Sequence, residues 1–368
     1  MLAGGEFWVA GKKIIVAGHI CLDITPVFPV TNSQQPLSKL LVPGKLVQMA
    51  GVDLNTGGAV ANTGLALKIL GADVTLMGKV GDDAFGRLIL ERLQQYGAAD
   101  GMIVSKDSDT SYSIVIAPPG TDRIFLHNPG ANDTFEARDI DDSILAGAGW
   151  FHFGYPPIMR HMYERDGEEL VEIFQRAKTM GLMTSLDMAA VDPDSDAGHA
   201  DWTTILRRVL PYVDCFVPSV EELCYMVDRA RYQCWLERAA GGDVTEVLRV
   251  EEDIRPLAQQ VIALGAHELM LKCGAPGLYY TDGIKERFQH SYKPAQVLSG
   301  TGAGDTSIAA FLKARMDGYP LDTCLRYAAG TGASCVEAYD ALSGLRSFEE
   351  LDRKIASGWE EQQSNLMM

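Results

Sequence analysis

The sequence predicts an α/β protein built on a doubly wound, mostly parallel central sheet. Short apolar runs alternate with helical stretches along the chain, which is typical of parallel strands joined by crossover helices. The apolar fraction of 47 % over 368 residues is large enough to cover both faces of such a sheet. No internal repeat and no low-complexity linker divides the chain. We therefore expect one α/β domain over residues 1–368.

The expected strands are short apolar runs suited to a buried parallel sheet. They lie at residues 13–16, 74–79, 150–153, 184–187, 215–217 and 268–272. Helices are expected between them, for example at residues 85–95, 170–180 and 254–264. The polar stretch 229–250 has a helical tendency, and we interpret it as an insertion to which the sequence assigns no chemistry.

Two segments, about 24–56 and 111–128, interrupt this alternation. The first is rich in Pro, Val and Gly. The second alternates polar and apolar residues, turns at a Pro-Pro-Gly-Thr sequence, and continues as a second run, which predicts a pair of strands. A surface hairpin without function is the alternative interpretation of the second segment.

The strongest functional pattern lies near the C-terminus. It is Leu298-Ser299-Gly300-Thr301-Gly302-Ala303-Gly304-Asp305-Thr306. Apolar residues follow at helical spacing, so Gly302, Ala303 and Gly304 should form the first turn of a buried helix. First-turn N–H groups have no intrahelical partner, and with the helix dipole they form an anion site.

Asp305 follows this anion site directly. Donors for a phosphoryl group and a carboxylate that accepts a hydroxyl proton are what a kinase needs. We expect the helix N-terminus to favour the ionised carboxylate at neutral pH. The segment is neither a Walker A loop, because no Gly-Lys-Ser/Thr sequence follows, nor a dinucleotide fingerprint, because the third glycine is missing. An ordinary glycine-rich junction before a helix is the alternative.

A second glycine motif occurs upstream, with the sequence Gly57-Gly58-Ala59-Val60-Ala61-Asn62. The glycine pair should open a helix that ends near Gly71, and Asn62 lies about one turn inside it. Small residues allow a ligand or another backbone to come close, and an amide can both donate to and accept from hydroxyl groups. Tight helix–sheet packing with an incidental Asn is the alternative.

Together these two segments resemble the two signatures of the ribokinase-like, or PfkB, family of carbohydrate kinases. Their order and separation along the chain fit the family. Residues 16–23, 78–86 and 271–277 add further similarity, so the resemblance extends from about residue 12 to about residue 355. It implies a ribokinase-like fold in which segments 24–56 and 111–128 form a small β lid over the substrate, with a homodimer through the lid as an open option.

The resemblance also implies roles for individual residues. Asp305 would be the catalytic base, and Gly302, Ala303 and Gly304 the anion hole. The implied substrate-binding residues are Asp23, Gly57, Gly58, Asn62 and Asn132. The implied nucleotide-binding residues are Lys272, Gly274 and Gly277, and Glu222 would reach a metal ion through water. A turn cap is the alternative for Asp23 and a turn residue for Asn132, while His19 is left unassigned.

The sequence departs from the family pattern in two places. Ser299 and Gly300 stand where an Asp-Thr pair is common, and that Asp helps to build a monovalent-cation site in the family. Activation by potassium is therefore doubtful. Ser219 stands where the family has the Asn of an Asn-x-x-Glu motif, although Glu222 keeps the acidic position. ATP and Mg²⁺ remain the expected cofactors, because the metal must neutralise the triphosphate.

Charge and composition exclude several classes of partner and location. The formal net charge of −17 argues against nucleic acid and anionic membranes. There is no run of 18 apolar residues, and the N-terminus lacks the pattern of a secretory signal. The seven cysteines form no Cys-x-x-Cys pair, which favours reduced thiols in the cytoplasm.

The sequence leaves the acceptor open. We expect a small sugar or sugar acid, as for a ribokinase, a fructokinase or a 2-keto-3-deoxygluconate kinase. A nucleoside kinase is the alternative, for which Tyr112, Phe125 and Tyr155 could supply aromatic contacts. A pair of basic residues for a sugar phosphate is not identified. A non-catalytic regulator on the same fold is also open, whereas a dehydrogenase is disfavoured because Gly18 is the only glycine of residues 18–23.

Overall fold

A computed structural model of the chain describes residues 13–29, 37–118, 123–363 and 366. The strands of its main sheet are β1 Lys13–Gly18, β4 Val74–Met77, β9 Ala148–Gly154, β10 Met183–Asp187, β11 Cys215–Phe216, β12 Glu268–Lys272, β13 Gly277–Thr281 and β14 Glu286–His290. They lie in the order β14-β13-β12-β11-β10-β9-β1-β4. The strands from β12 to β4 pair in parallel, while β13 and β14 are antiparallel.

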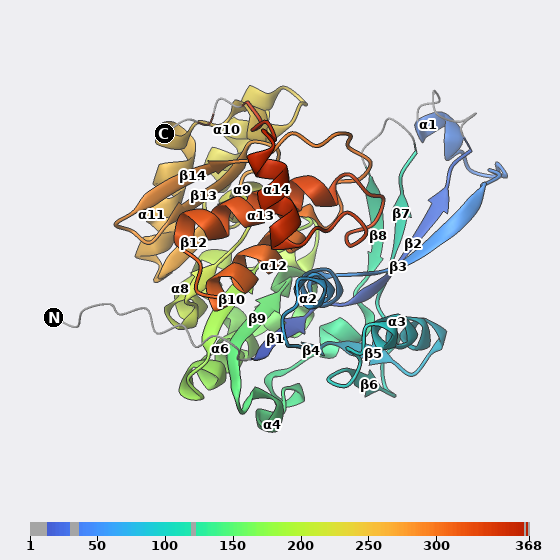
Figure 1. Cartoon of the computed structure of the whole chain (residues 1–368). Helices are drawn as coiled ribbons and strands as arrows, with labels where there is room; N and C mark the ends of the chain where they lie inside the picture. The colour runs from blue at the N-terminus through green and yellow to red at the C-terminus, as the bar shows by residue number, and fades with distance from the viewer. Residues whose placement is uncertain (1–12, 30–36, 119–122, 364–365, 367–368) are drawn as a thin grey trace.

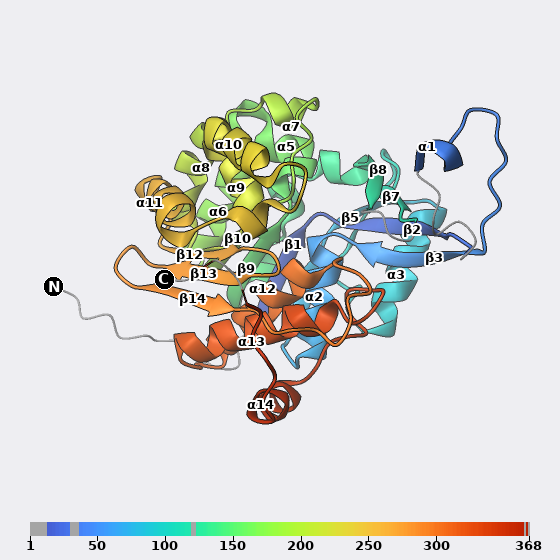
Figure 2. The ribbon, with the colours of Figure 1, turned by 90° about the horizontal axis from the view of Figure 1, so that it is seen from above.

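Helices cover both faces of this sheet (Figures 1 and 2). The α-helices of the described residues are α1 Leu37–Leu40, α2 Ala59–Ile69, α3 Ala84–Gln95, α4 Asp142–Leu145, α5 Arg160–Tyr163, α6 Glu168–Thr179, α7 Asp196–His199, α8 Trp202–Val209, α9 Val220–Val227, α10 Arg229–Ala239, α11 Arg255–Ala263, α12 Ala303–Met316, α13 Leu321–Cys335 and α14 Phe348–Ala356. Of these, α1 lies away from the main sheet. In Figure 2, α2, α12, α13 and α14 lie on one side of the sheet, and α6, α8, α9, α10 and α11 on the other. The architecture is the doubly wound α/β fold that the sequence predicts.

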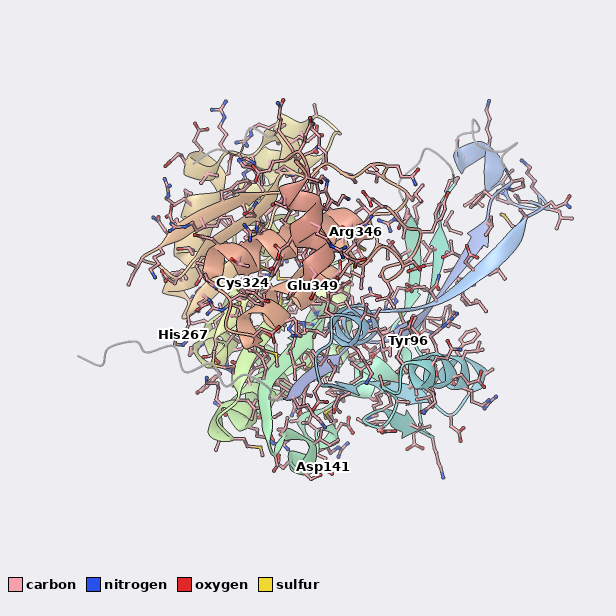
Figure 3. All side chains as sticks on the ribbon, in the orientation of Figure 1. Tyr96, Asp141, His267, Cys324, Arg346 and Glu349 are labelled. Carbon is pink, nitrogen blue, oxygen red and sulfur yellow. The ribbon has the colours of Figure 1, made fainter. Side chains whose placement is uncertain are left out.

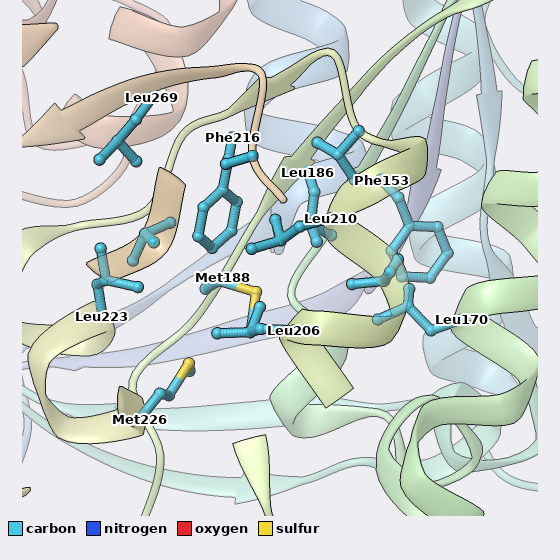
Figure 4. Packing of buried hydrophobic residues seen from close by; sticks show 14 of the residues in the cluster. Phe153, Leu170, Leu186, Met188, Leu206, Leu210, Phe216, Leu223, Met226 and Leu269 are labelled. Atoms are coloured by element: carbon cyan, nitrogen blue, oxygen red, sulfur yellow. The ribbon is translucent and has the colours of Figure 1, made fainter. Parts of the chain in front are cut away.

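Each face of the sheet has its own hydrophobic core. On one face, strand side chains such as Leu186 and Phe216 pack against Leu170, Leu206 and Leu223 from α6, α8 and α9 (Figure 4). The other core packs α2, α12 and α13 against the opposite face of the same strands. Because α12 lies between the sheet and α13 and also contacts α2, it is buried along most of its length, and its first turn has a fixed position.

A second sheet projects from the side of the main body (Figure 1). Its strands are β2 Cys21–Val27, β3 Gly51–Gly57, β7 Tyr112–Ile116 and β8 Ile124–Asn128, in the order β3-β2-β7-β8. They fall in the two segments that interrupt the main alternation, and we call this sheet the lid sheet. The expected Pro-Gly turn within the second segment lies mostly outside the described residues.

The structure differs from the expected elements in three places. The strand expected at 74–79 is divided at Gly78, after which β5 Lys79–Gly81 pairs with β6 Ile103–Ser105 in a separate two-stranded sheet. The hairpin of β13 and β14 was not expected. Within 229–250, the helical tendency is confirmed by α10, which buries Trp235 in the core.

All seven cysteines are free thiols, and all but Cys234 are buried; Cys324, labelled in Figure 3, lies on α13. Within the described part of the chain, no helix is both long and apolar enough to cross a membrane.

Candidate active site

The candidate site lies where the strand order of the main sheet reverses. β1 and β9 are neighbours there, and the chain leaves them toward opposite sides of the sheet. In open α/β sheets, this crevice at the carboxyl ends of the strands is the usual place for a ligand. His19 follows β1 and Tyr155 follows β9, so both side chains come from the rim of the crevice. Their rings stack with centroids 6.2 Å apart.

Asp305 is the centre of the site. It is the third residue of α12, and its side chain is only 4 % exposed. Asn62 of α2 donates from Nδ2 to Asp305 Oδ2 at 3.0 Å. The Tyr155 hydroxyl donates to Oδ1 at 2.8 Å and to Oδ2 at 2.9 Å. Residues from α2, α12 and the end of β9 therefore meet at one carboxylate.

Burial changes the acid–base properties of Asp305. Removal from water raises the pKa of this carboxyl above its ordinary value, although Lys272, Tyr155 and Asn62 act in the opposite direction. Desolvation therefore opposes the stabilisation of the ionised form that we expected from the helix N-terminus. A raised pKa makes the ionised carboxylate a stronger base, which suits proton abstraction.

The anion hole lies at the start of α12. Gly302 is the N-cap with φ 77°, and the Thr306 N–H closes the first helical bond onto the Gly302 carbonyl at 2.8 Å. Within the described residues, no hydrogen-bond acceptor takes the N–H of Gly304 or Asp305. A Cβ at Gly304 would lie 3.3 Å from Cδ of Lys272, so this lysine runs beside the helix terminus. The two free N–H groups and the Lys272 side chain therefore lie close together at the start of α12.

A buried ion pair supports this lysine. Lys272 Nζ donates to Asp187 Oδ1 at 2.6 Å, and Asp187 has no exposed surface. Burial raises the pKa of Asp187 to about 8 although Lys272 opposes the shift. Burial disfavours the charge of Lys272, but Asp187, Glu222 and Asp305 together raise its pKa. Asp187 Oδ2 is buried without a partner among the described residues, so it can accept a bond from a ligand.

The acceptor side of the crevice is built around Asp23 of β2. Gly57 lies directly against the Asp23 carboxylate, where a Cβ would overlap it. Gly58 has φ 86°, and a Cβ there would lie 2.5 Å from the His19 carbonyl oxygen. Both glycines are therefore required by close approach. Burial raises the pKa of Asp23 to about 6, while Cys21, Ser113 and Arg123 lower it.

The lid sheet contributes further polar groups to this side. His127 of β8 lies 5.1 Å from His19 between ring centroids, and its Nδ1 is 3.0 Å from the Ser113 hydroxyl. Arg123 approaches the Ser299 hydroxyl at 3.4 Å, next to the anion hole. The lid sheet is thus connected with both the acceptor side and the phosphate side of the crevice.

The geometry can now be compared with known proteins. The sequence profile of the pfkB family carbohydrate kinases matches residues 12–347. The chain belongs to this family. It is similar to the ribokinase of Bacillus subtilis, with 25 % identity over 346 residues that cover 94 % of this chain and 100 % of the ribokinase.

Solved structures show the same fold. Ribokinase of Arabidopsis thaliana, complexed with ribose and ATP, has a TM-score of 0.70 at 22 % identity, covering 93 % of this chain and 98 % of that one. A putative ribokinase II from E. coli, in complex with ATP and Mg²⁺, has a TM-score of 0.70 at 20 % identity, covering 94 % and 99 %. The ribokinase-like fold expected from the sequence is confirmed.

In this carbohydrate kinase, two of the residues expected to bind ligands also make structural contacts. Asn132 is fully buried, and its amide bonds the backbone of Ile20 in both directions and the Pro129 carbonyl. These bonds support the loop after β1, and a contact of Asn132 with the substrate stays a prediction. Gly277 opens β13 with φ 139°, and close packing against the Gln289 carbonyl accounts for the glycine without a nucleotide.

Two other expected residues have additional partners. Glu222 and Ser219 form a reciprocal capping box at the start of α9, with Ser219 N donating to Glu222 Oε2 at 2.8 Å. Its role as the N-cap of α9 therefore accounts for a Ser at position 219. Gly274 has φ 64°, and a Cβ there would lie 2.9 Å from the Thr245 hydroxyl oxygen. The 229–250 stretch therefore packs against the expected nucleotide-side loop.

Sequence reasoning missed three residues of this carbohydrate kinase's site. Asp187 ends the buried strand β10. Because ligands bind at the carboxyl ends of parallel strands, its position in the sequence could have indicated a site residue. His19 is 1 % exposed, and its Nδ1 has no partner among the described residues. Tyr155 was expected only as an aromatic contact for a nucleoside. Its bond to Asp305 joins residues 150 positions apart and had no local signal.

Proposed function

We propose that this enzyme transfers the γ-phosphoryl group of ATP to a hydroxyl of a small sugar or sugar acid. The observation that carries the proposal is the buried carboxylate of Asp305 beside the unpaired N–H groups of Gly304 and Asp305. Oriented donors stabilise the phosphoryl oxygens, and an adjacent base accepts the proton of the attacking hydroxyl.

Each part of the site has a place in this reaction. The acceptor oxygen attacks the γ-phosphorus while its proton moves to Asp305, and the bond to the ADP oxygen breaks. The free N–H groups of Gly304 and Asp305 would face the transferred oxygens, and Lys272 adds positive charge beside them. The protein thus acts by positioning and by electrostatics.

Magnesium fits the acidic side of this site. Among the described residues, no group of three or more His, Cys, Asp or Glu side chains could hold a metal ion by itself. Mg²⁺, however, is usually held by one or two carboxylates together with waters and substrate phosphates. The unpaired Asp187 Oδ2 and the charge of Glu222 supply such a partial site. Bound there, the ion would neutralise charge on the triphosphate.

Potassium activation is not expected. Ser299 and Gly300 offer no carboxylate, and the Arg123 guanidinium already lies 3.4 Å from the Ser299 hydroxyl. A second cation placed there would be repelled by the guanidinium.

The acceptor side favours a hydroxyl-rich molecule over a nucleoside. Asp23 and the unpaired Nδ1 of His19 are polar partners for hydroxyl groups. The aromatic contacts that a base would need are dispersed, because Tyr112 packs edge-on against Phe85 and Phe125 is half exposed. Arg123 near Asp23 is suited to the carboxylate of a sugar acid.

Asp305→Asn tests this function. Loss of the base should lower turnover by about 10²–10⁴, while nucleotide binding survives because the backbone donors remain. ADP release would be measured against a panel of sugars, sugar acids and nucleosides, and ATP binding by calorimetry. Asp317→Asn, the same change at the other end of α12, is the matched control. Near-normal turnover of a folded Asp305→Asn protein would refute the assignment of Asp305 as the base. Wild-type activity that is confined to nucleosides would refute a sugar or sugar acid as the acceptor.

A further inference from the structure

The Tyr155 hydroxyl stands where an acceptor hydroxyl has to stand. It donates to both oxygens of Asp305, at 2.8 and 2.9 Å. A substrate hydroxyl that gives its proton to a general base must approach the carboxylate within about 2.6–3.2 Å. In the protein without ligand, the phenol therefore makes the contact that the reaction requires of the acceptor.

The remaining surface of the Asp305 carboxylate is also occupied. Asn62 Nδ2 donates to Oδ2 at 3.0 Å, and the Thr63 hydroxyl lies 3.4 Å from Oδ1. With a side chain only 4 % exposed, Asp305 has no open side for another oxygen. Asn62 and Thr63 belong to the buried helix α2, so of these donors Tyr155 is the one at the rim of the crevice.

The backbone holds Tyr155 in this place against its own preference. Its φ of 70° and ψ of 41° are left-handed, a conformation that is unfavourable for a non-glycine residue. Pro156 follows, and a residue before proline normally takes an extended conformation. Gly154 is packed tightly against Ala59, so the chain before the tyrosine is fixed. Such an outlier points to a function when it lies at a site.

We propose that Tyr155 is a placeholder for the acceptor hydroxyl, which keeps water away from Asp305 until the acceptor displaces the phenol. This proposal rests on the proposed function. Without the phenol, a water oxygen could attack the γ-phosphorus, pass its proton to Asp305 and release ADP and inorganic phosphate. With the phenol in place, bound ATP is preserved. The stacked rings of His19 and Tyr155 couple the displacement to binding on the acceptor side.

Tyr155→Phe removes the hydroxyl and keeps the ring. ADP release from ATP and Mg²⁺ without any acceptor should rise on the order of tenfold, the change expected when one hydrogen bond to a charged group is lost. For whichever acceptor the wild type phosphorylates, KM should fall while kcat changes little, because the acceptor no longer competes with the phenol. Tyr163→Phe, which removes a hydroxyl from a ring packed on Trp202, is the matched control and should leave both rates unchanged.

Each alternative role of Tyr155 predicts a result that differs from that of the placeholder. If Tyr155 only positions the base, Tyr155→Phe will lower ADP release with and without acceptor, and the proposal is wrong. If intact-mass measurement of the wild type with ATP shows phosphate on Tyr155, the phenol is an acceptor and not a placeholder. Tyr155→Leu serves if the Phe variant fails to fold, with the same expectation for acceptor-free ADP release. A wild type without activity on any acceptor would count against the proposed function, whereas an active wild type with unchanged hydrolysis in the variant would count against the placeholder alone.

Discussion

Two carboxyl groups in the crevice, Asp23 and Asp305, have pKa values raised by burial. At neutral pH each must ionise in surroundings that disfavour its charge, so each lowers the stability of the fold while it serves ligand binding or proton transfer. Turnover should therefore fall as the pH is lowered through the pKa of Asp305, which lies above that of an ordinary aspartate. For Asp23 the consequence is a measurable dependence of stability on pH.

Asp23→Asn should stabilise the protein at pH 7. The folded-state pKa of about 6 lies above the unfolded value near 3.9, so the folded state binds more protons between these values and loses stability as the pH rises through them. Removing the charge should raise the free energy of unfolding at pH 7 by at most about 3 kcal/mol. Urea unfolding of both proteins at pH 7.5 and pH 4.5 measures this difference.

The difference between variant and wild type should shrink at the lower pH, where the folded-state carboxyl is already protonated. A difference that stays the same at both pH values would show that it comes from packing and not from ionisation. Acceptor affinity should fall in the same variant, since an amide cannot replace both oxygens of the carboxylate.

At the scale of a single element, the proposed chemistry depends on the first turn of α12. The helix is buried between α2, α13 and the sheet from Asp305 onward, while Gly302, Ala303 and Gly304 are partly exposed, so a phosphoryl group can reach the free N–H groups. The side chain of Lys272 runs beside Gly304, within 3.6 Å of the place of a Cβ. Gly304 therefore leaves the space that both the phosphoryl group and the side chain of Lys272 need.

Gly304→Val should reduce ATP-dependent turnover sharply, because its branched side chain would enter the space of Lys272 and the phosphoryl oxygens. Gly304→Ala is the matched control, since a lone Cβ at 3.3 Å asks the flexible lysine to move only slightly. Steady-state kinetics in ATP would separate the two, with the larger KM in the Val variant. An active Gly304→Val enzyme would mean that the phosphate binds elsewhere.

For the whole molecule, the lid sheet carries several exposed apolar side chains. Val52 and Leu54 of β3 and Ile124, Phe125 and Leu126 of β8 are 38–56 % exposed. Apolar side chains gathered on a projecting sheet indicate a surface that another molecule covers. We propose that a second copy of the chain covers it, so that a homodimer forms through the lid while each main α/β domain keeps its own site.

Leu54→Asp combined with Leu126→Asp should convert such a dimer to a monomer, because charges at the core of an interface are strongly unfavourable. Sedimentation velocity measures the change directly. Ile284→Asp, on an exposed turn between β13 and β14, is the control and should leave the dimer intact. A wild type that sediments as a monomer at micromolar concentration would refute the dimer.

The sequence by itself determined the alternation of strands and helices, the family, and the start of α12. These depend on local physics: apolar periodicity decides what each segment can bury, and glycine decides where the backbone can turn left-handed or approach closely, as at Gly302 and Gly58. The start of α12 was predictable because an unsatisfied first turn is a property of the helix itself.

Only the tertiary structure decided which side chains meet. Asn62 and Asp305 are 243 positions apart, Tyr155 and Asp305 are 150 apart, and Lys272 and Asp187 are 85 apart. No local pattern encodes such pairs, because the same residue type suits a turn, a cap or a ligand contact equally well. Asn132 shows the consequence: the sequence suggested a substrate contact, and only the packed chain shows that its amide bonds the backbone of Ile20. Burial, which raises the pKa of Asp305, likewise exists only once the layers have assembled.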